Sequence, residues 1–218
     1  SQPVTIINCK FIKNNVNKNY GAFYVEPRNK CQSISVINCT FDQNNAKCNG
    51  GAIGFDSSLS STLSISFINC TIENNFANIE SGAFYTRNNC ELTLESTSFI
   101  RNKASSSSSS NKENEGNCGA LFLSYVDKPS SITVLDCTFE ENQADNKYGA
   151  IYMTSSVSST SLLIKNCTFN NNKAENDYTT LYLDSKTDKS SVSVTDSTFR
   201  IVYNEKVCSA LFLGTNSD

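Results

Sequence analysis

Hydrophobic and polar residues alternate with a period of two in short segments spread along the whole chain. In one of these segments Ile34 and Val36 enclose Ser35. Such alternation is typical of a strand with one buried and one solvent-facing side. The hydrophobic pairs are Val4 and Ile6, Ile34 and Val36, Ile65 and Phe67, Leu92 and Leu94, Ile132 and Val134, Leu162 and Ile164, and Val192 and Val194. The pattern predicts equivalent strands, with these pairs facing a core and mainly Ser or Thr facing solvent.

A second pattern follows each alternating segment and fixes the spacing of the copies. Its anchor is an apolar residue, usually Phe, that comes two positions after a Cys, Thr or Ser. The anchors are Phe11, Phe41, Ile72, Phe99, Phe139, Phe169 and Phe199. Subtraction gives intervals of 30, 31, 27, 40, 30 and 30 residues. Self-similarity at a period of roughly 20 to 50 residues is the signature of a solenoid.

These repeats predict an all-β fold, a parallel β-helix of about seven coils with three strands in each coil. The first strand is the alternating segment, and the second carries Cys39 and Phe41 inward with Thr40 outward. The third begins at a Gly-Gly-Ala-Ile sequence. Equivalent strands would stack about 4.8 Å apart. We expect residues 1–218 to form a single domain within a longer protein, with a mobile Ser-, Asn- and Glu-rich insertion around 104–117.

Asparagine marks the predicted turns. Three residues after the anchor, the first six copies carry an Asn, a residue that tolerates left-handed backbone and hydrogen-bonds nearby main chain. This column is Asn14, Asn44, Asn75, Asn102, Asn142 and Asn172. The residue three positions before the anchor is likewise Asn, Asp or Ser. We interpret both positions as turns between strands, stacked as ladders along the solenoid.

The Gly-Gly-Ala-Ile motif allows a comparison with a known family. It stands as Gly51-Ala52-Ile53 after the anchor copy at 41–44, and looser copies are Gly21-Ala22-Phe23, Gly82-Ala83-Phe84, Gly119-Ala120-Leu121 and Gly149-Ala150-Ile151. Paired with Phe-x-x-Asn, it resembles the repeats of the chlamydial polymorphic membrane protein family, which also occur in surface proteins of some protozoa. The resemblance covers essentially the whole chain and weakens in the last two copies. It implies a right-handed β-helix displayed at a cell surface and concerned with adhesion.

Composition narrows the classes of function. Lys and Arg number 18 against 21 Asp and Glu, and the resulting charge of −3 is too small to attract nucleic acid or an anionic membrane. The chain has no His, which removes the commonest general base and metal ligand, and no Trp. It has no apolar run of about 18 residues that could cross a membrane. We therefore expect no nucleic-acid partner, no direct membrane insertion, no metal and no other cofactor.

The ten cysteines fall into two groups. Five precede the anchor and are expected to form an inward packing column, because free Cys behaves as a small hydrophobe and parallel side chains do not favour disulfides between coils. They are Cys9, Cys39, Cys70, Cys137 and Cys167. The other five lie at turns or coil joints and are better placed for disulfides in an extracellular setting. They are Cys31, Cys48, Cys90, Cys118 and Cys208.

Asn38, Asn69 and Asn166 each begin an Asn-Cys-Thr sequence that fits the N-glycosylation acceptor. Attachment of a glycan requires these side chains to face solvent in a secretory pathway. Turn chemistry and stacked amides explain the same residues without a glycan. Both interpretations stay open.

The third strand of each coil carries the residues that we interpret as a binding surface. Three positions after the start of the Gly-Ala copy stands an aromatic residue, except in the second copy, where Gly54 interrupts the column. The column is Tyr24, Tyr85, Phe122, Tyr152, Tyr182 and Phe212. Because the flanking residues are apolar, alternation places the rings outward, where they could stack on sugars or meet a partner protein. Stacking of the rings on one another is the structural alternative.

Some parallel β-helices degrade polysaccharides, a chemistry that needs clustered carboxylates on an outer face. The nearest approach to such a cluster is Asp136, Glu140 and Glu141 in one coil. The other candidate acids are Asp56, Asp184 and Asp196. We expect no two acids at adjacent outward positions of one strand column. No catalytic residue is therefore assigned.

Together these patterns favour a non-enzymatic extracellular or cell-surface domain for adhesion or ligand display, with a protein or glycan surface as its partner. The alternative is an architectural segment of an extracellular fibre or coat. That segment would associate with copies of itself or with neighbouring segments of the same assembly.

Overall fold

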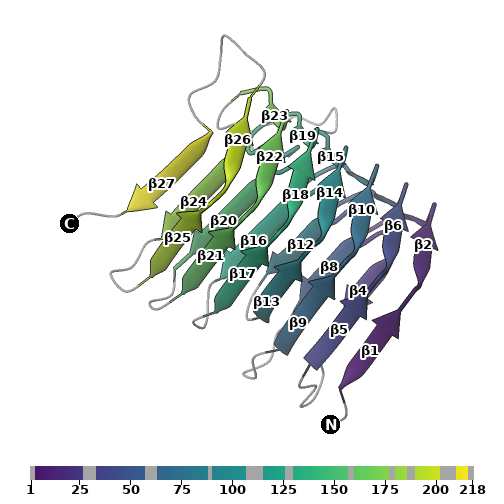
Figure 1. Ribbon diagram of the computed structural model, residues 1–218. Coiled ribbons are helices and arrows are strands. Elements are labelled where there is room, and N and C mark those ends of the chain that lie inside the picture. The colour runs from purple at the N-terminus through teal and green to yellow at the C-terminus, as the bar shows by residue number, and fades with distance from the viewer. Residues whose placement is uncertain are drawn as a thin grey trace.

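The fold is a stack of short parallel strands. The computed structural model describes residues 3–26, 33–56, 63–87, 90–106, 115–125, 130–156, 160–176, 180–185, 190–201 and 210–215. These residues form 27 strands and no helix, and all strand pairs are parallel. Figure 1 shows the strands in rows, from the N-terminal coil in purple to the C-terminal strands in yellow. The predicted all-β parallel solenoid is confirmed.

Two long rows make up sheets A and B, with seven strands each. Sheet A contains β1 (Val4–Ile7), β5 (Ser33–Ile37), β9 (Leu63–Ile68), β13 (Cys90–Glu95), β17 (Ser131–Leu135), β21 (Ser161–Lys165) and β25 (Ser191–Thr195). Sheet B contains β2 (Lys10–Ile12), β6 (Thr40–Asp42), β10 (Thr71–Glu73), β14 (Ser98–Ile100), β18 (Thr138–Glu140), β22 (Thr168–Asn170) and β26 (Thr198–Arg200).

Two further rows make up sheet C, with six strands among the described residues, and sheet D, with seven. Sheet C contains β3 (Asn15–Val16), β7 (Asn45–Ala46), β11 (Phe76–Ala77), β15 (Lys103–Ala104), β19 (Gln143–Ala144) and β23 (Lys173–Ala174). Sheet D contains β4 (Phe23–Val25), β8 (Ile53–Asp56), β12 (Phe84–Arg87), β16 (Leu121–Tyr125), β20 (Ile151–Ser155), β24 (Leu181–Ser185) and β27 (Leu211–Thr215).

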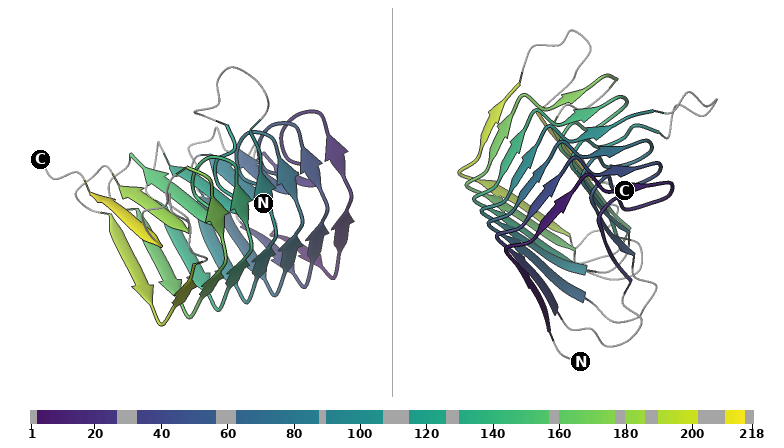
Figure 2. Two further views of the ribbon diagram at one scale, coloured as in Figure 1. Left: turned by 90° about the horizontal axis from the view of Figure 1, so that it is seen from above. Right: turned by 90° about the vertical axis from the view of Figure 1, so that its right-hand side faces the viewer.

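A coil contains four strands rather than the three predicted, and the solenoid makes about six turns rather than seven coils. The strand that the sequence did not reveal is the two-residue strand of sheet C. Two residues are too few to show a period of two, so this strand was interpreted as part of a turn. The right-hand view in Figure 2 shows the sheets wound around one interior. No helix among the described residues is long and apolar enough to cross a membrane.

Copies of the repeat pair with one another position by position. Ile65 has Ile34 as its partner in the coil before and Leu92 in the coil after. The predicted hydrophobic pairs of the central coils are buried, and the anchor rings stack inside them, with Phe99 and Phe139 4.9 Å apart and 2° from parallel. In-register stacking therefore builds one continuous core along the axis.

Left-handed backbone marks the corners of each coil. At the corner between sheets A and B it is the residue three before the anchor, such as Asn38 with φ of 53°, as predicted. At the corner between sheets B and C it is Gln43 or Arg101, with φ of 55° and 50°, one position before the Asn column. Asn44 and Asn102 do lie at this turn between strands and form the predicted ladder, but the left-handed backbone belongs to the residue before each of them. Their side chains point into the solenoid, where they hydrogen-bond to neighbouring coils.

The Asn column is a hydrogen-bonded ladder inside the solenoid. The Asn102 Nδ2 donates to Asn142 Oδ1 at 3.0 Å and to the Ile72 carbonyl at 2.9 Å. Its Oδ1 accepts from the Asn75 backbone N–H at 3.1 Å and from Asn75 Nδ2 at 2.9 Å. The same pattern repeats at Asn44. Buried amides are tolerated here because both ends of each amide have partners.

The Cys column combines packing with hydrogen bonding. Its buried members are Cys39, Cys70, Cys137 and Cys167, while Cys9 in the first coil is exposed. In the fourth copy the Thr97 hydroxyl donates to the Glu95 carbonyl at 3.0 Å and accepts the Cys70 N–H at 3.2 Å. Ser197 makes the equivalent pair of bonds. The position therefore needs a hydroxyl or thiol, which explains why Thr and Ser replace Cys there.

The eight described cysteines are free thiols. The predicted disulfides are therefore wrong for Cys48, Cys90 and Cys118, while Cys31 and Cys208 lie outside the described residues. Burial raises the pKa of the Cys118 thiol to about 12 and also raises that of Cys90. Both thiols are buried and stay protonated at neutral pH.

The predicted insertion around 104–117 is described only at its two ends, because residues 107–114 lie outside the described part of the chain. At one end the Ser105 hydroxyl donates to Asp145 at 2.6 Å. At the other, the Gly116 N–H donates to the Ile79 carbonyl at 2.7 Å. Both ends are thus bonded to neighbouring coils.

Candidate functional site

The predicted aromatic column lies along sheet D. Tyr85 pairs with Phe122, which pairs with Tyr152, and Tyr182 pairs with Phe212. Rings of this column form a cluster separate from the main core. The column therefore lies on the outer side of the sheet, as alternation predicted.

The rings of this column stack on one another. Tyr85 and Phe122 have centroids 5.0 Å apart and planes 11° from parallel, and Tyr182 and Phe212 are 4.7 Å apart and 5° from parallel. Tyr85 is 4% exposed and Phe122 8%, whereas Tyr24 in the first coil is 46% exposed. The faces of the inner rings are covered by neighbouring rings, so a sugar could reach little more than their edges. This geometry favours a structural role for the inner part of the column.

Gly54 does not interrupt the aromatic column, and that prediction was wrong. The ring of Tyr20 lies over Gly54, where any Cβ would collide with it. Tyr20 stacks on Tyr24 at 4.7 Å and reaches Tyr85 at 6.0 Å. Tyr20 has a left-handed backbone, with φ of 65°, which directs its ring into this gap. The missing ring of one coil is thus replaced from the coil before.

A carboxyl group lies beside the aromatic column. Burial raises the pKa of Glu80 above its ordinary range, and the Arg87 guanidinium and the Tyr85 hydroxyl oppose that shift in part. The same burial raises the pKa of Tyr152. These groups therefore stay largely out of water on this side of the solenoid.

The three glycosylation acceptors lie at the corner between sheets A and B. Asn38, Asn69 and Asn166 are exposed and have left-handed backbones. Asn69 Nδ2 donates to Asn38 Oδ1 at 2.8 Å, and Asn166 Nδ2 donates to Asp136 at 2.6 Å. The side chains are accessible, and glycosylation stays a prediction.

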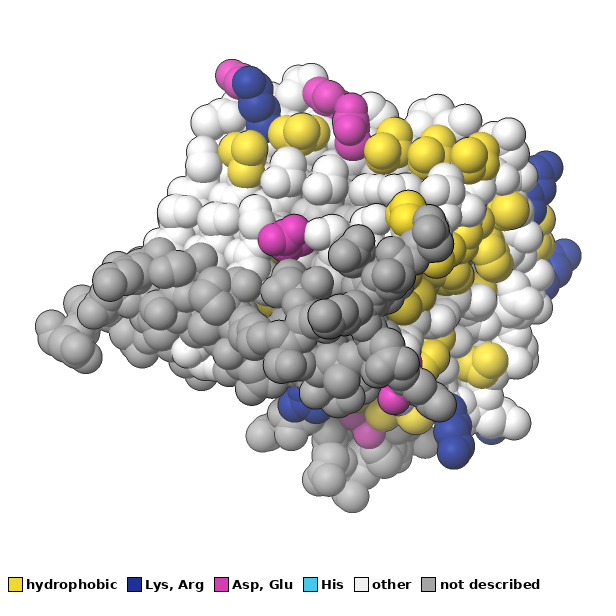
Figure 3. Space-filling model, turned by 90° about the horizontal axis from the view of Figure 1, so that it is seen from below, with side chains coloured by type: hydrophobic (Ala, Val, Ile, Leu, Met, Phe, Trp, Pro, Cys, Tyr) yellow, Lys and Arg dark blue, Asp and Glu magenta, His cyan; other side chains and the backbone are white. Residues whose placement is uncertain are grey.

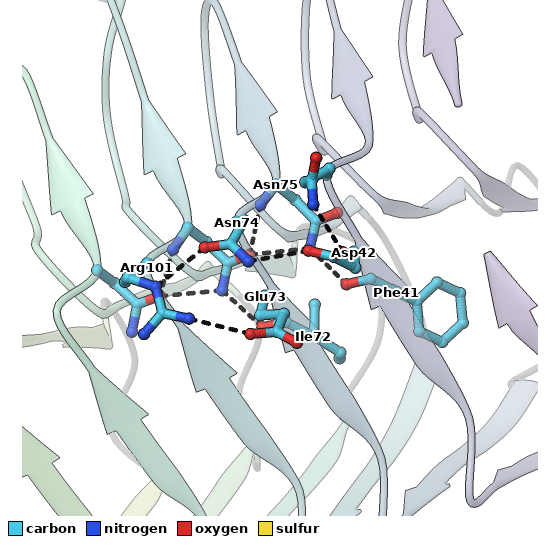
Figure 4. A network of polar contacts seen from close by, with 10 residues as sticks. Phe41, Asp42, Ile72, Glu73, Asn74, Asn75 and Arg101 are labelled. Carbon is cyan, nitrogen blue, oxygen red and sulfur yellow. Dashed lines mark hydrogen bonds and ion pairs between the residues drawn. The ribbon is translucent and has the colours of Figure 1, made fainter. Parts of the chain in front are cut away.

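Two acids do occupy adjacent outward positions, contrary to the prediction. Asp42 and Glu73 are register partners on β6 and β10 of sheet B. Figure 4 shows that both belong to a polar network at the corner between sheets B and C. Asn74 Nδ2 donates to Asp42 at 2.9 Å, and Arg101 donates to Asn74 at 3.0 Å and to Glu73 at 3.1 Å. Asp42 and Glu73 were not among the candidate acids, because each stands at the first variable position after its anchor.

The other candidate acids are dispersed. Asp136 accepts a hydrogen bond from Asn166, and Glu140 accepts one from Asn170 at 3.1 Å. Asp184 lies in register with Thr154 on sheet D. Asp196 is exposed at a corner, and of Asp56 the structure describes the strand position without the side chain. Across the described ranges, no group of three or more Cys, Asp or Glu side chains is placed to hold a metal ion.

The outer surface also contains a polar groove at the corner between sheets B and C, which we call the corner groove. Its volume is about 420 Å³, within the range of roughly 300 to 1,000 Å³ that is usual for ligand sites. It is lined by Arg101, Asn102, Lys103, Glu141, Gln143, Asn171 and Lys173. Three consecutive coils contribute to it, so the groove follows the solenoid axis.

Ion pairs position the charged side chains of the corner groove. Arg101 is held by Glu73 at 3.1 Å, and Lys103 by Asp145 at 2.9 Å. Burial would raise the pKa of Asp145, but the Ser105 hydroxyl and the Lys103 ammonium outweigh it and lower that pKa. The carboxylate therefore stays ionised, and each of the two cations is paired with a carboxylate along one wall of the groove.

No family model matches the chain, and comparison with curated proteins and with solved structures gives no match either. The resemblance to the polymorphic membrane protein repeats therefore stays a prediction that rests on the motifs.

The corner groove was missed because its residues occupy the variable positions between the anchor and the next strand. Arg101 and Glu141 are the second variable residues of Phe-x-x-Asn, and Lys103 and Gln143 follow the buried Asn. A signal was nevertheless present. At the position after the buried Asn, copies four to six carry the long polar residues Lys103, Gln143 and Lys173, whereas the first three copies carry Asn15, Asn45 and Phe76.

Proposed function

We propose that this chain is a non-enzymatic surface domain that binds a ligand on its outer face, as in adhesion or ligand display. The observation that carries the proposal is the corner groove, in which two cations are already paired with carboxylates above a rigid backbone. Arg101 and Lys103 are held by ion pairs, and the buried Asn ladder fixes the backbone beneath them. A preorganised surface binds without the loss of freedom that a mobile one would suffer.

A catalytic role has weaker support. The adjacent acids Asp42 and Glu73 accept hydrogen bonds from Gln43, Asn74 and Arg101. A glycosidase needs one carboxyl group that donates a proton and one that attacks or activates water. Donors directed at both acids stabilise contacts between coils and do not prepare either acid for proton donation.

An extracellular setting, a right-handed winding and kinship with the polymorphic membrane protein repeats are parts of this proposal. Parallel crossover connections are right-handed in about 98% of cases, in agreement with the winding that the resemblance implies. The acceptor asparagines are exposed at the corner between sheets A and B. Glycans there would project from a different corner and leave the groove open. Deglycosylation followed by mass measurement of the native protein tests whether they are attached.

Binding of the purified, labelled chain to intact cells tests the proposed function. Saturable binding that excess unlabelled chain displaces is the expected result. Absence of binding at every cell type, together with growth of assemblies detected by light scattering, would replace the proposal with the architectural alternative.

One observation favours that alternative. On the outer side of sheet A, Ile7 is in register with Ile37, which is in register with Ile68, and Leu135 continues this column beyond Glu95. Figure 3 shows hydrophobic side chains lined up along a face of the molecule and interrupted by acidic ones. A row of this kind could support lateral packing of copies. Ile37→Lys together with Ile68→Lys should then abolish assembly while leaving cell binding intact.

A further inference from the structure

We propose that the corner groove binds a neutral oligosaccharide through hydrogen bonds to its hydroxyl groups. This inference rests on the proposed binding function and names its site and ligand class. It also moves the site away from the aromatic column, whose inner rings cover one another.

The lining of the groove matches the chemistry of a polyhydroxylated ligand. A sugar hydroxyl both donates and accepts, so it needs donors and acceptors close together. The groove supplies guanidinium and ammonium donors from Arg101 and Lys103, carboxylate acceptors from Glu141, and amides from Gln143 and Asn171 that do both. Apolar ligands would leave these groups without partners, which is unfavourable.

Charge balance favours a neutral ligand over an anionic one. The groove and its ion pairs hold three cations and three carboxylates. The cations are Arg101, Lys103 and Lys173, and the carboxylates are Glu73, Glu141 and Asp145. An acidic polysaccharide would have to compete with the existing carboxylates for Arg101 and Lys103, whereas neutral hydroxyl groups can use the donors that those pairs leave free.

The shape of the groove favours a chain of sugars over a single one. Lys103, Gln143 and Lys173 are register partners in successive strands of sheet C, about 4.8 Å apart. Arg101, Glu141 and Asn171 repeat in the same way at the left-handed corner. Two parallel polar rows therefore flank the groove, and a linear oligosaccharide lying along the axis would meet both.

Gln143 and Asn171 are the residues to change. Within the described part of the chain, neither side chain makes a hydrogen bond, so their removal should leave the fold intact. The test variant is Gln143→Ala with Asn171→Ala. The control is Gln43→Ala with Asn45→Ala, which removes amides from the same two positions in an earlier coil, outside the groove. Gln43 and Asn171 share the left-handed site, with φ of 55° and 53°, so both variants place Ala there. The control also loses one exposed hydrogen bond, from Gln43 to Asp42 at 2.9 Å, so unchanged binding in it is the more stringent result.

The experiment uses a printed array of neutral hexose and N-acetylhexosamine tetrasaccharides, with uronate-bearing and sulfated counterparts. We expect saturable binding to at least one neutral tetrasaccharide. Affinity should fall about tenfold in the Gln143 and Asn171 variant, since two hydrogen bonds are lost, and stay unchanged in the control. Matching thermal unfolding curves establish that both variants are folded.

Three results would overturn the inference: no sugar is bound, acidic sugars alone are bound, or the groove variant binds as tightly as the native chain. The cell-binding assay separates these failures from failure of the proposed function. A groove variant that binds cells as well as the native chain removes the oligosaccharide site and leaves the binding function standing at another surface. If neither the native chain nor the variants bind cells, both the oligosaccharide site and the proposed binding function are wrong.

Discussion

Asn102→Ala should be among the most destabilising substitutions in this chain. The Asn102 side chain is 0% exposed and makes four hydrogen bonds to neighbouring coils. Truncation to Ala leaves two donors of Asn75 without an acceptor and the Ile72 carbonyl without its amide donor. Each buried group left unsatisfied costs about 1–3 kcal/mol. The expected loss in the free energy of unfolding is about 4 kcal/mol, a large share of the roughly 5–15 kcal/mol of a typical domain.

The matched control is Asn14→Ala in the same column. The Asn14 side chain is exposed in the first coil and donates one hydrogen bond, to Asn44 Oδ1 at 2.8 Å. When this donor is removed, water can hydrogen-bond to Asn44 in its place, so the free energy of unfolding should change by less than about 1 kcal/mol. Urea unfolding followed by circular dichroism measures both variants under identical conditions.

Equal losses in the two variants would refute the reasoning. They would mean that the Asn ladder contributes no more to the free energy of unfolding at the centre than at its end. Packing of the anchor side chains alone would then hold the coils in register. A large loss at Asn102 with little change at Asn14 would establish the buried amides as a main source of stability.

Three further predictions concern other positions. Thr97→Val should lower the free energy of unfolding by about 1–3 kcal/mol, because the Cys70 N–H loses its acceptor, whereas Thr97→Cys should change it little. Similar urea midpoints for the two variants would contradict this prediction. Gly54→Ala should lower the free energy of unfolding by about 1–3 kcal/mol in the native chain, because the new Cβ collides with the Tyr20 ring, and by much less in a Tyr20→Ala background. If the two losses simply add in the double-mutant cycle, the Tyr20 ring does not fill the gap over Gly54. Burial raises the pKa of Glu80, so the free energy of unfolding should fall as pH rises from about 4.5 through the folded-state pKa. In Glu80→Gln this fall should be smaller; if the melting temperatures of the native chain and the variant change with pH in the same way, the prediction is wrong.

The core could be predicted from the sequence because its signals are local. Alternation identified the inward pairs of sheet A, and the repeat spacing aligned anchors such as Phe99 and Phe139, which stack as expected. Features that depend on a neighbouring coil were not predicted. Nothing in the residues around Gly54 indicates that Tyr20 fills its place, and the inward turn of the Asn column depends on carbonyl groups of other coils.

The candidate site was harder to predict for the same reason. Position along the strand placed the aromatic column outward, but whether its ring faces are accessible depends on in-register stacking, which covers Tyr85 and Phe122. The corner groove consists of variable positions from three coils. Each coil alone contributes two or three unremarkable polar side chains, and the groove exists only when the copies are stacked.

The in-register corners have a genetic consequence. Asp136 and Asn166 occupy equivalent left-handed sites, with φ of 54° and 52°, 30 residues apart. A recombination event that deletes or duplicates one such period would join the chain at matching corners, and the ladders would close across the junction. Deleting or duplicating one period should therefore change the length of the solenoid, and with it the extent of its outer face, without changing the fold.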